Sequence, residues 1–303
     1  MPESMPVIVH HMAALDGQEP PPNSLEAIRA CLEANAAYIE IDVTALAESD
    51  YLLVHDPILE SETTGSGEVG KTTPAQAKDF FFKKGARATS YRVPLLSDVV
   101  ALFQQYETPT RLQIDFKNML PFDNDEPLQR LLISIEPLGK RVIVSTCADW
   151  QLRKLRRLAP WLDLGFDIGF YLDFRESSGN PLDFPHQKGA YGYLDDHPIA
   201  SIKFWPTADY LVDRCGMYVG LVPGVSTFYI SYKLLIQSLD DGFNWAEALH
   251  AAGIKLDAWT MDVGRPDAER SLPRLIEAGI DFITTNTPQA MAELIGRLAP
   301  VNP

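Results

Sequence analysis

Two acidic residues separated by a single position, Glu40 and Asp42, form the first group in this sequence that could do chemistry. They lie in Tyr38–Val43, where polar and apolar residues alternate, and side chains two residues apart on a β-strand share a face. Adjacent carboxylates repel each other, and burial strengthens the repulsion. Because a divalent cation with oxygen ligands relieves it, the pair predicts a metal site rather than an ordinary exposed acidic pair.

Two later segments predict strands that end in further polar residues. Tyr51–Val54 is a short apolar run that would deliver His55 at its end. In Arg111–Lys117 the alternation places Asp115 and Lys117 on one face of a strand. A plain salt bridge between these two residues is the alternative to a shared role in a reaction.

The first predicted strand, Val7–Val9, is followed by two neighbouring histidines, His10 and His11. Neighbouring side chains of a strand point to opposite faces, so only one of the two can face the other polar residues. From these residues alone, either histidine fits that position.

Collected at strand ends, these residue types suit the cleavage of a phosphodiester. A hard cation held by Glu40, Asp42 and Asp115 would offset the charge that builds on a phosphoryl oxygen. Lys117 would add a second positive charge. One imidazole would act as base toward the attacking hydroxyl and another, with His55 as a candidate, would act as acid or base on the other side of the reaction.

Strand and helix patterns alternate along nearly the whole chain, which predicts a parallel sheet with helical crossovers. Strands are expected at 7–9, 38–43, 51–54, 111–117, 141–145, 202–205, 255–260 and 281–284, and helices at 25–32, 94–106, 126–137, 148–159, 207–215, 243–252, 267–278 and 288–298. About eight strands with polar residues at their ends predict a single-domain α/β fold, a (β/α)8 TIM barrel covering residues 1–303. An open doubly wound sheet is the alternative, but no glycine-rich nucleotide fingerprint follows any predicted strand.

Three segments have no clear periodicity. Residues 56–73 form an irregular loop, residues 217–230 fit no element, and residues 173–198 predict a lid-like insertion, since a long structureless stretch in a compact domain is usually functional.

The composition limits the partners. A net charge of -15 and a pI near 4.8, with no basic run, exclude nucleic acid as a good partner, because its binding depends on cationic contacts to phosphate. Three widely spaced cysteines predict no disulfide framework. With no basic, apolar leader at the N-terminus and no run of 18 apolar residues, we expect a cytoplasmic protein without a transmembrane segment.

On these residues the chain resembles the glycerophosphodiester phosphodiesterase family and its sphingomyelinase D-like phospholipase relatives, and the likeness extends over nearly the whole chain. The motifs of the family are similar to segments that occur here in the same order. They are Pro22-Asn23-Ser24, Glu40-Ile41-Asp42, His55-Asp56, Thr63-Thr64-Gly65-Ser66-Gly67, Asp115-Phe116-Lys117, Trp259-Thr260-Met261-Asp262 and Thr284-Thr285-Asn286-Thr287-Pro288. The resemblance implies an enzyme of lipid metabolism, a hydrolase that uses one divalent cation, Mg²⁺ or Ca²⁺.

The departures from the family pattern bear on the substrate. The family's first motif, H-R-G, is replaced by His10-His11-Met12. The strand spacing of the family favours His10 as the catalytic histidine, which would put His11 in the place of a phosphate-binding arginine. If His11 is the family histidine instead, the motif reads H-M, as in the sphingomyelinase D-like relatives. Those relatives also carry Asp before the lysine, as Asp115 is here.

The remaining candidates lie near the end of the chain. Trp259 stands at a predicted strand end, where it would form the floor of a substrate pocket or pack in the core. Asn286 is a substrate-binding candidate, and Asp262 is a further residue that could line the pocket. His186, His197 and His250 have no carboxylate or cysteine at ligand spacing and are expected to have no role in the site.

The resulting hypothesis is a metal-dependent phosphodiesterase that cleaves a glycerophosphodiester or a related (lyso)phospholipid headgroup by histidine acid–base catalysis. Its catalytic residues would be His10 and His55, its metal ligands Glu40, Asp42 and Asp115, and its substrate-binding residues His11, Lys117, Trp259 and Asn286. The alternatives are a lyase that stops at a cyclic phosphate and a barrel that binds a phosphorylated ligand without turnover. A Schiff-base aldolase is remote, because a lysine beside a metal site stays charged.

Overall fold

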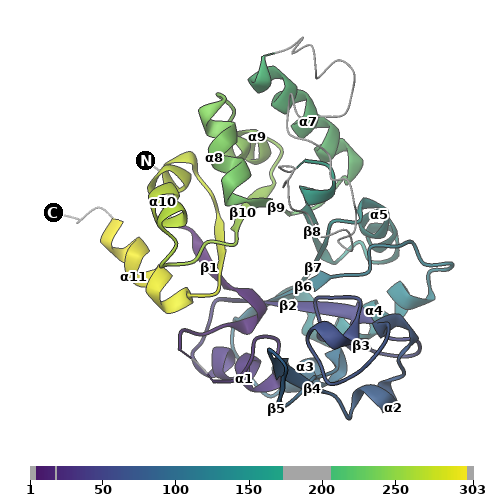
Figure 1. Ribbon diagram of the computed structural model, residues 1–303. Coiled ribbons are helices and arrows are strands. Elements are labelled where there is room, and N and C mark those ends of the chain that lie inside the picture. The colour runs from purple at the N-terminus through teal and green to yellow at the C-terminus, as the bar shows by residue number, and fades with distance from the viewer. Residues whose placement is uncertain (1–4, 18, 173–205, 299–303) are drawn as a thin grey trace.

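The computed structural model describes residues 5–17, 19–172 and 206–298, and it shows a closed barrel of parallel strands surrounded by helices (Figure 1). Eight of the described strands form the barrel. In the order in which they neighbour one another they are β1 (Val7–His10), β2 (Tyr38–Ala45), β6 (Arg111–Phe116), β7 (Val142–Thr146), β8 (Asp163–Asp167), β9 (Thr227–Ser231), β10 (Lys255–Trp259) and β11 (Phe282–Thr285). Because β1 pairs with both β11 and β2, the sheet closes, and the predicted (β/α)8 barrel is confirmed.

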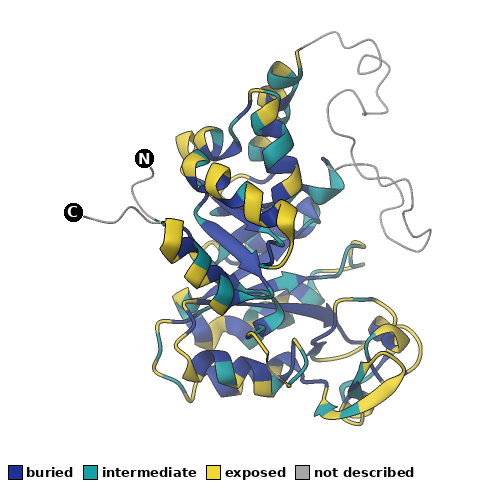
Figure 2. Cartoon of the chain, turned by 60° about the vertical axis from the view of Figure 1, so that its left-hand side comes forward, coloured by how far each residue is buried: buried dark blue, intermediate teal, exposed yellow. Residues whose placement is uncertain are grey.

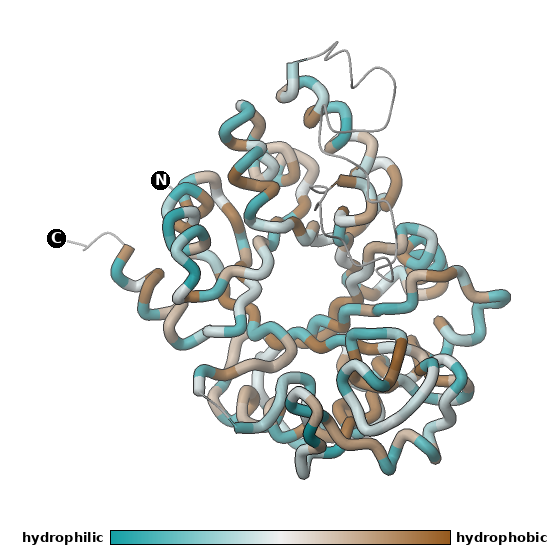
Figure 3. Tube along the Cα trace, viewed as in Figure 1, coloured by the Kyte–Doolittle hydropathy of each residue, from teal (hydrophilic) through white to brown (hydrophobic). Residues whose placement is uncertain are grey.

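Most of the helices lie outside the barrel and alternate apolar with polar residues along their length (Figure 3). The α-helices are α1 (Leu25–Glu33), α2 (Pro74–Ala77), α3 (Leu96–Phe103), α4 (Glu126–Ile135), α5 (Asp149–Leu158), α7 (Thr207–Leu221), α8 (Tyr232–Asp240), α9 (Trp245–Ala251), α10 (Pro266–Ala278) and α11 (Pro288–Leu298). Short 3₁₀ turns are η1 (His11–Ala13), η2 (Leu59–Ser61), η3 (Val69–Lys71), η4 (Glu136–Arg141) and η5 (Ile168–Phe170). The apolar faces of the helices bury the strands at the centre of the molecule (Figure 2).

Helix α1 begins where its sequence predicts. The Ser24 hydroxyl accepts a hydrogen bond from the Ala27 backbone N–H, which satisfies one of the unpaired donors of the first turn. Ile28 and Leu32 are buried against the barrel. With Ser24 as the cap, the preceding Asn23 is free for another role, which it has in the site described below.

A small second cluster of apolar side chains lies beside the barrel. Strand β3 (Tyr51–Leu52) pairs antiparallel with the end of β2, and β4 (Phe81–Lys84) forms a hairpin with β5 (Arg87–Arg92). The cluster that holds these segments together consists of Leu46, Leu52, Val54, Leu59, Val69, Ala77, Phe82, Val93 and Leu95. It fixes the irregular loop that follows His55.

One strand assigned from the sequence differs from the structure, and two strands of the barrel were not predicted. The segment 51–54 is not a barrel strand, because β3 is short and runs antiparallel to β2. The barrel instead uses β8 and β9, which the sequence did not indicate. β8 begins and ends with aspartate and contains Gly165, features that weaken any strand signal. Gly165 is required there, because a Cβ would come within 2.3 Å of the Tyr229 ring inside the barrel.

Several expectations concern residues outside the described ranges, namely the lid at 173–198, the strand at 202–205, His186 and His197. Among the residues that are described, no helix is long and apolar enough to cross a membrane.

The barrel interior holds a buried carboxyl group without a described cation beside it. Asp257 of β10 is fully buried, and both of its oxygens accept from the Thr284 hydroxyl, at 3.0 and 2.9 Å. Burial raises the pKa of Asp257 from its ordinary 3.8 to about 7, although the Thr284 hydrogen bonds oppose the shift. This carboxyl group therefore loses its proton near neutrality while it remains buried inside the barrel.

Replacing Asp257 by asparagine should make the protein more resistant to alkaline pH. The pKa of Asp257 is higher in the folded protein than in the unfolded chain, so folding is favoured while the carboxyl is protonated. That stabilisation is complete below the pKa of the unfolded chain and is lost as the pH rises through the pKa of the folded protein. The stability of D257N relative to the wild type should therefore rise by about 3 kcal/mol between pH 5 and pH 8.5. Urea unfolding of both proteins at the two pH values measures this difference, and equal pH dependence would contradict it.

Candidate active site

The polar residues gather at the carboxyl ends of the barrel strands. On β2 and β6 the register places Glu40 beside Gln113 and Asp42 beside Asp115. One oxygen from each of Glu40, Asp42 and Asp115 lies within 4.8 Å of the others. Glu40 and Asp42 are buried and Asp115 is partly buried. The predicted meeting of these three carboxylates is confirmed by the structure.

Lys117 completes this acidic cluster from just beyond the end of β6. Its Nζ lies 2.9 Å from Asp42 Oδ1 and 2.6 Å from Asp115 Oδ2. Asp42 Oδ1 nevertheless makes no hydrogen bond of normal geometry with any described residue. The ion pair with Asp115, which was the alternative to a role in the reaction, is present, and it belongs to the same cluster as the candidate metal ligands.

Charge and burial act on these groups in opposite directions. Burial first, and then Asp42 and Asp115, raise the pKa of Glu40 well above its ordinary 4.5. Burial alone would raise the pKa of Asp42 and lower that of Lys117. Their mutual attraction outweighs burial, so the pKa of Asp42 falls and that of Lys117 rises. A lysine held in its charged form cannot serve as a Schiff-base nucleophile, which argues against an aldolase.

Asn23 holds Asp42 and the turn after β1 together. It is fully buried and has a φ of +62°, a conformation that asparagine tolerates better than most residues. Its backbone N–H donates to the Met12 carbonyl at 2.7 Å, and its side-chain oxygen accepts from the Asp42 N–H at 3.2 Å. The sequence showed Asn23 only as part of a motif, because this role depends on contacts between distant segments.

His11 is the histidine that faces the carboxylates. Its Nε2 lies 4.0 Å from Glu40 Oε2, and its Nδ1 makes a 2.8 Å hydrogen bond with Asn286 Oδ1. The Asn286 amide nitrogen in turn donates to both oxygens of Asp262, at 3.2 and 3.1 Å. Asp262 therefore orients Asn286, and Asn286 orients the His11 ring so that Nε2 is directed toward the cluster. Both ends of the Asn286 amide are thus engaged by His11 and Asp262, and its role in binding substrate stays a prediction.

His10 lies on the outer side of the barrel, contrary to the expectation that it enters the site. It is in register with Ile39 of β2, and its Nδ1 hydrogen-bonds to the Ala14 carbonyl at 2.9 Å and lies 3.6 Å from Cys31 Sγ. Burial lowers its pKa, against the effect of the Ala14 hydrogen bond. A turn follows in which Met12 has a φ of +50°, and this turn directs His11 inward.

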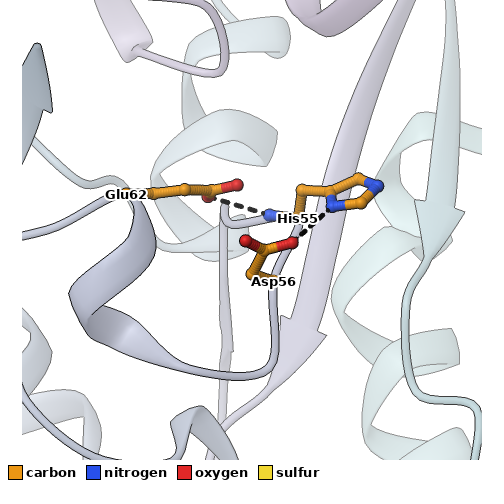
Figure 4. A group of neighbouring side chains, drawn as sticks. All are labelled: His55, Asp56 and Glu62. Atoms are coloured by element: carbon orange, nitrogen blue, oxygen red, sulfur yellow. Dashed lines mark hydrogen bonds and ion pairs between the residues drawn. The ribbon is translucent and has the colours of Figure 1, made fainter. Parts of the chain in front are cut away.

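His55 stands in the loop after β3 with two carboxylates around it (Figure 4). Its Nδ1 is 2.8 Å from Asp56 Oδ1, and its backbone N–H donates to Glu62 Oε2 at 3.0 Å. The side chain is 53% exposed. Its electrostatic interaction with Asp42 helps to lower the pKa of Asp42. Because β3 pairs with the end of β2, His55 lies at the same end of the barrel as the acidic cluster, with Nε2 on the side of the ring away from Asp56.

Two other predicted residues can be placed. Trp259 ends β10 and is partly exposed, and its buried Nε1 makes no hydrogen bond with a described residue. His250 lies in α9 and pairs with Asp281 at 2.8 Å. This pair is at the opposite ends of the strands from the acidic cluster, since Asp281 precedes β11. The expectation that His250 plays no part in the site agrees with this position.

A parallel barrel with three carboxylates, a lysine and two imidazoles at its carboxyl end has the layout of a barrel enzyme, since barrel enzymes carry their active sites at that face. Comparison with known proteins places the chain within that class. Residues 16–185, more than half of the chain, match the glycerophosphoryl diester phosphodiesterase family. The chain belongs to this family of phosphoric diester hydrolases.

Individual relatives agree with the family assignment. The glycerophosphodiester phosphodiesterase of Caldanaerobacter subterraneus is 23% identical over 282 residues, which cover 92% of this chain and 94% of that protein. The crystal structure of a glycerophosphodiester phosphodiesterase from Parabacteroides distasonis has a TM-score of 0.65 at 16% identity and covers 96% of this chain and 97% of its own. An Oleispira antarctica phosphodiesterase in complex with the product sn-glycerol-3-phosphate has a TM-score of 0.62 at 17% identity, covering 96% and 97%.

Proposed function

We propose that this protein is a metal-dependent glycerophosphodiester phosphodiesterase in which His11 and His55 are the acid–base pair. Its substrate would be a glycerophosphodiester or a related lysophospholipid headgroup. The Oleispira antarctica relative was solved with sn-glycerol-3-phosphate as product, which is the kind of phosphate monoester this reaction would release. Lys117 would contact a phosphate oxygen, and Trp259 would line the substrate pocket.

The charge of the acidic cluster carries this proposal. Glu40, Asp42 and Asp115 contribute three negative charges when ionised, and Lys117 contributes one positive charge, so the cluster has a net charge of -2. Such a charge is unstable when it is buried, and one divalent cation would balance it. The donors are all carboxylate oxygens, which suits Mg²⁺ or Ca²⁺, and Asp42 Oδ1 lacks a hydrogen-bond donor of normal geometry.

When bound, the cation would supply positive charge to a phosphoryl oxygen. The residues of the chain would carry out the proton transfers. One imidazole takes the proton from the attacking hydroxyl of the substrate, whose oxygen forms a bond to phosphorus. The other imidazole protonates the leaving oxygen as its bond to phosphorus breaks. Asn286 holds His11 and Asp56 holds His55 with Nε2 available for these transfers.

A lyase that stops at a cyclic phosphate is the second candidate function. Its support is that His11, and not His10, faces the cluster, so the motif reads His11-Met12 and lacks an arginine. Asp115 in front of the lysine is a second feature that resembles the sphingomyelinase D-like branch. Both candidates share the first bond change and differ only in whether water opens the cyclic product.

The expected result in ³¹P NMR is a chelator-sensitive conversion of glycerophosphocholine or lysophosphatidylcholine to a phosphate monoester when Mg²⁺ or Ca²⁺ is present. EDTA should stop the reaction, and renewed addition of the cation should restore it. A cyclic phosphate signal that persists would favour the lyase instead. No change in either substrate with either cation would contradict catalysis on these substrates.

A further inference from the structure

The main chain at His55 is not held by a sheet. Strand β3 ends at Leu52, and the next two backbone N–H groups donate to the carbonyls of Pro94 (3.1 Å) and Leu52 (3.0 Å). The N–H of His55 then donates to the side chain of Glu62, at 3.0 Å. Within the barrel, a residue such as Asp115 is held by the main chain of the neighbouring strand. At His55 the Glu62 carboxylate accepts the backbone N–H instead.

Glu62 is itself fixed by main-chain contacts with the hairpin. Its carbonyl accepts from the Lys83 N–H of β4 at 2.8 Å. The next residue, Thr63, is fully buried, and both its N–H and its hydroxyl donate to the Leu59 carbonyl, at 2.9 and 2.8 Å. The β4–β5 hairpin therefore sets the position of Glu62, and through Glu62 it sets the position of His55.

The location of the Glu62 carboxylate is electrostatically unfavourable. The side chain is partly buried, and one of its oxygens, Asp56 and the His55 ring lie within 4.8 Å of one another. Burial and the nearby Asp56 raise the pKa of Glu62, while the His55 N–H opposes the shift. A local electrostatic cost of this kind is typical of a functional position.

We propose that Glu62 is a positioning residue for His55: it holds the main chain so that the ring nitrogen opposite Asp56 reaches the substrate. In Figure 4 the His55 ring points away from Glu62, so the carboxylate acts through the backbone and not on the ring nitrogens. Asp56 fixes the rotation of the ring, and Glu62 fixes the position of its Cα. This inference rests on the proposed function, because it takes His55 to be an acid–base residue.

Removing Glu62 should reduce turnover and leave substrate binding unchanged. A catalytic group displaced by about 1 Å loses up to roughly a hundredfold in rate, so E62A should lower kcat by about 10- to 100-fold with KM within about threefold. E62Q keeps an oxygen acceptor for the His55 N–H and should recover kcat to within about threefold of the wild type. E60A is the matched control, because Glu60 lies in the same loop and accepts from Ser66 and Gly67 but does not contact His55.

Amide hydrogen exchange tests the same contact without requiring turnover. The His55 amide should exchange at least about tenfold faster in E62A than in the wild type, E62Q or E60A, because only E62A lacks its acceptor. If the wild type hydrolyses no phosphodiester, the proposed function fails, and hydrogen exchange still decides whether Glu62 holds the backbone. Unchanged exchange in E62A, or equal loss of kcat in E62A and E62Q, would overturn the proposal. So would the loss of a bound cation in E62A by calorimetry, since Glu62 would then be a ligand.

Discussion

Replacing His11 by alanine should lower kcat by about 10³-fold, while replacing the adjacent His10 by asparagine should leave kcat within about threefold. The reason is geometric. His11 Nε2 faces Glu40 at 4.0 Å, whereas His10 turns toward Ala14 and Cys31 on the outer side of the barrel. Steady-state kinetics on glycerophosphocholine with saturating Mg²⁺ or Ca²⁺ measures both effects.

The two variants control for each other. Asparagine at position 10 retains an N–H donor that can reach the Ala14 carbonyl, so H10N should unfold within a few degrees of the wild type. H11A should also keep its melting temperature, because His11 is partly exposed, and it should still bind the cation, since His11 is not among the carboxylate ligands. Loss of turnover in H10N with retention in H11A would restore the assignment of His10 as the catalytic histidine.

The acidic cluster could be predicted from the sequence because its determinants are local. Residues two apart on a strand share a face whatever the rest of the chain does, so Glu40 and Asp42 had to lie side by side, as did Asp115 and Lys117. The register between β2 and β6 then placed Asp42 directly beside Asp115. The location of the site at the carboxyl end of the barrel could also be predicted, because strand–helix alternation indicates a (β/α)8 barrel and such barrels carry their active sites there.

The choice between His10 and His11 could not be made in the same way. It depends on the turn at Met12 and Ala13, both of which have positive φ values, 50° and 58°. Neither residue type indicates that conformation, since positive φ is uncommon outside glycine, asparagine and aspartate. The turn is held by long-range contacts, among them the 2.7 Å hydrogen bond from the Met12 N–H to Glu40.

Roles that depend on contacts between residues far apart in the chain also could not be predicted from the sequence. The contacts of the Asn286 amide with Asp262 and His11 join residues that are separated by up to 275 positions along the chain. Glu62 gave no signal, because its contact with the His55 backbone requires the loop to fold back on itself. By contrast, the Asp56 contact is between neighbours, and the His55-Asp56 motif could have suggested it.

Replacing Glu40 by glutamine should stabilise the cation-free protein while abolishing cation-dependent activity. Burial, together with Asp42 and Asp115, raises the pKa of Glu40 above its ordinary 4.5. Protonated Glu40 therefore stabilises the fold in acid, and this stabilisation is lost as the pH rises through the pKa of Glu40 in the folded protein. The amide carries no charge and avoids that loss, which should make E40Q more stable than the wild type in EDTA at pH 8 by about 2 kcal/mol. Loss of one cation ligand should lower kcat by about 10³-fold.

The change in melting temperature on adding the cation shows whether Glu40 is a cation ligand or only a destabilising buried charge. Mg²⁺ or Ca²⁺ should raise the melting temperature of the wild type, because a ligand that binds only the folded state stabilises it, and should have little effect on E40Q. D257N is the matched control: it also removes a buried carboxyl with a raised pKa from inside the barrel, but Asp257 lies outside the acidic cluster. D257N should therefore gain stability at pH 8 and keep both its cation response and its activity. If E40Q retained a wild-type cation response, Glu40 would not be a ligand, and the site would have to form around Asp42 and Asp115 alone.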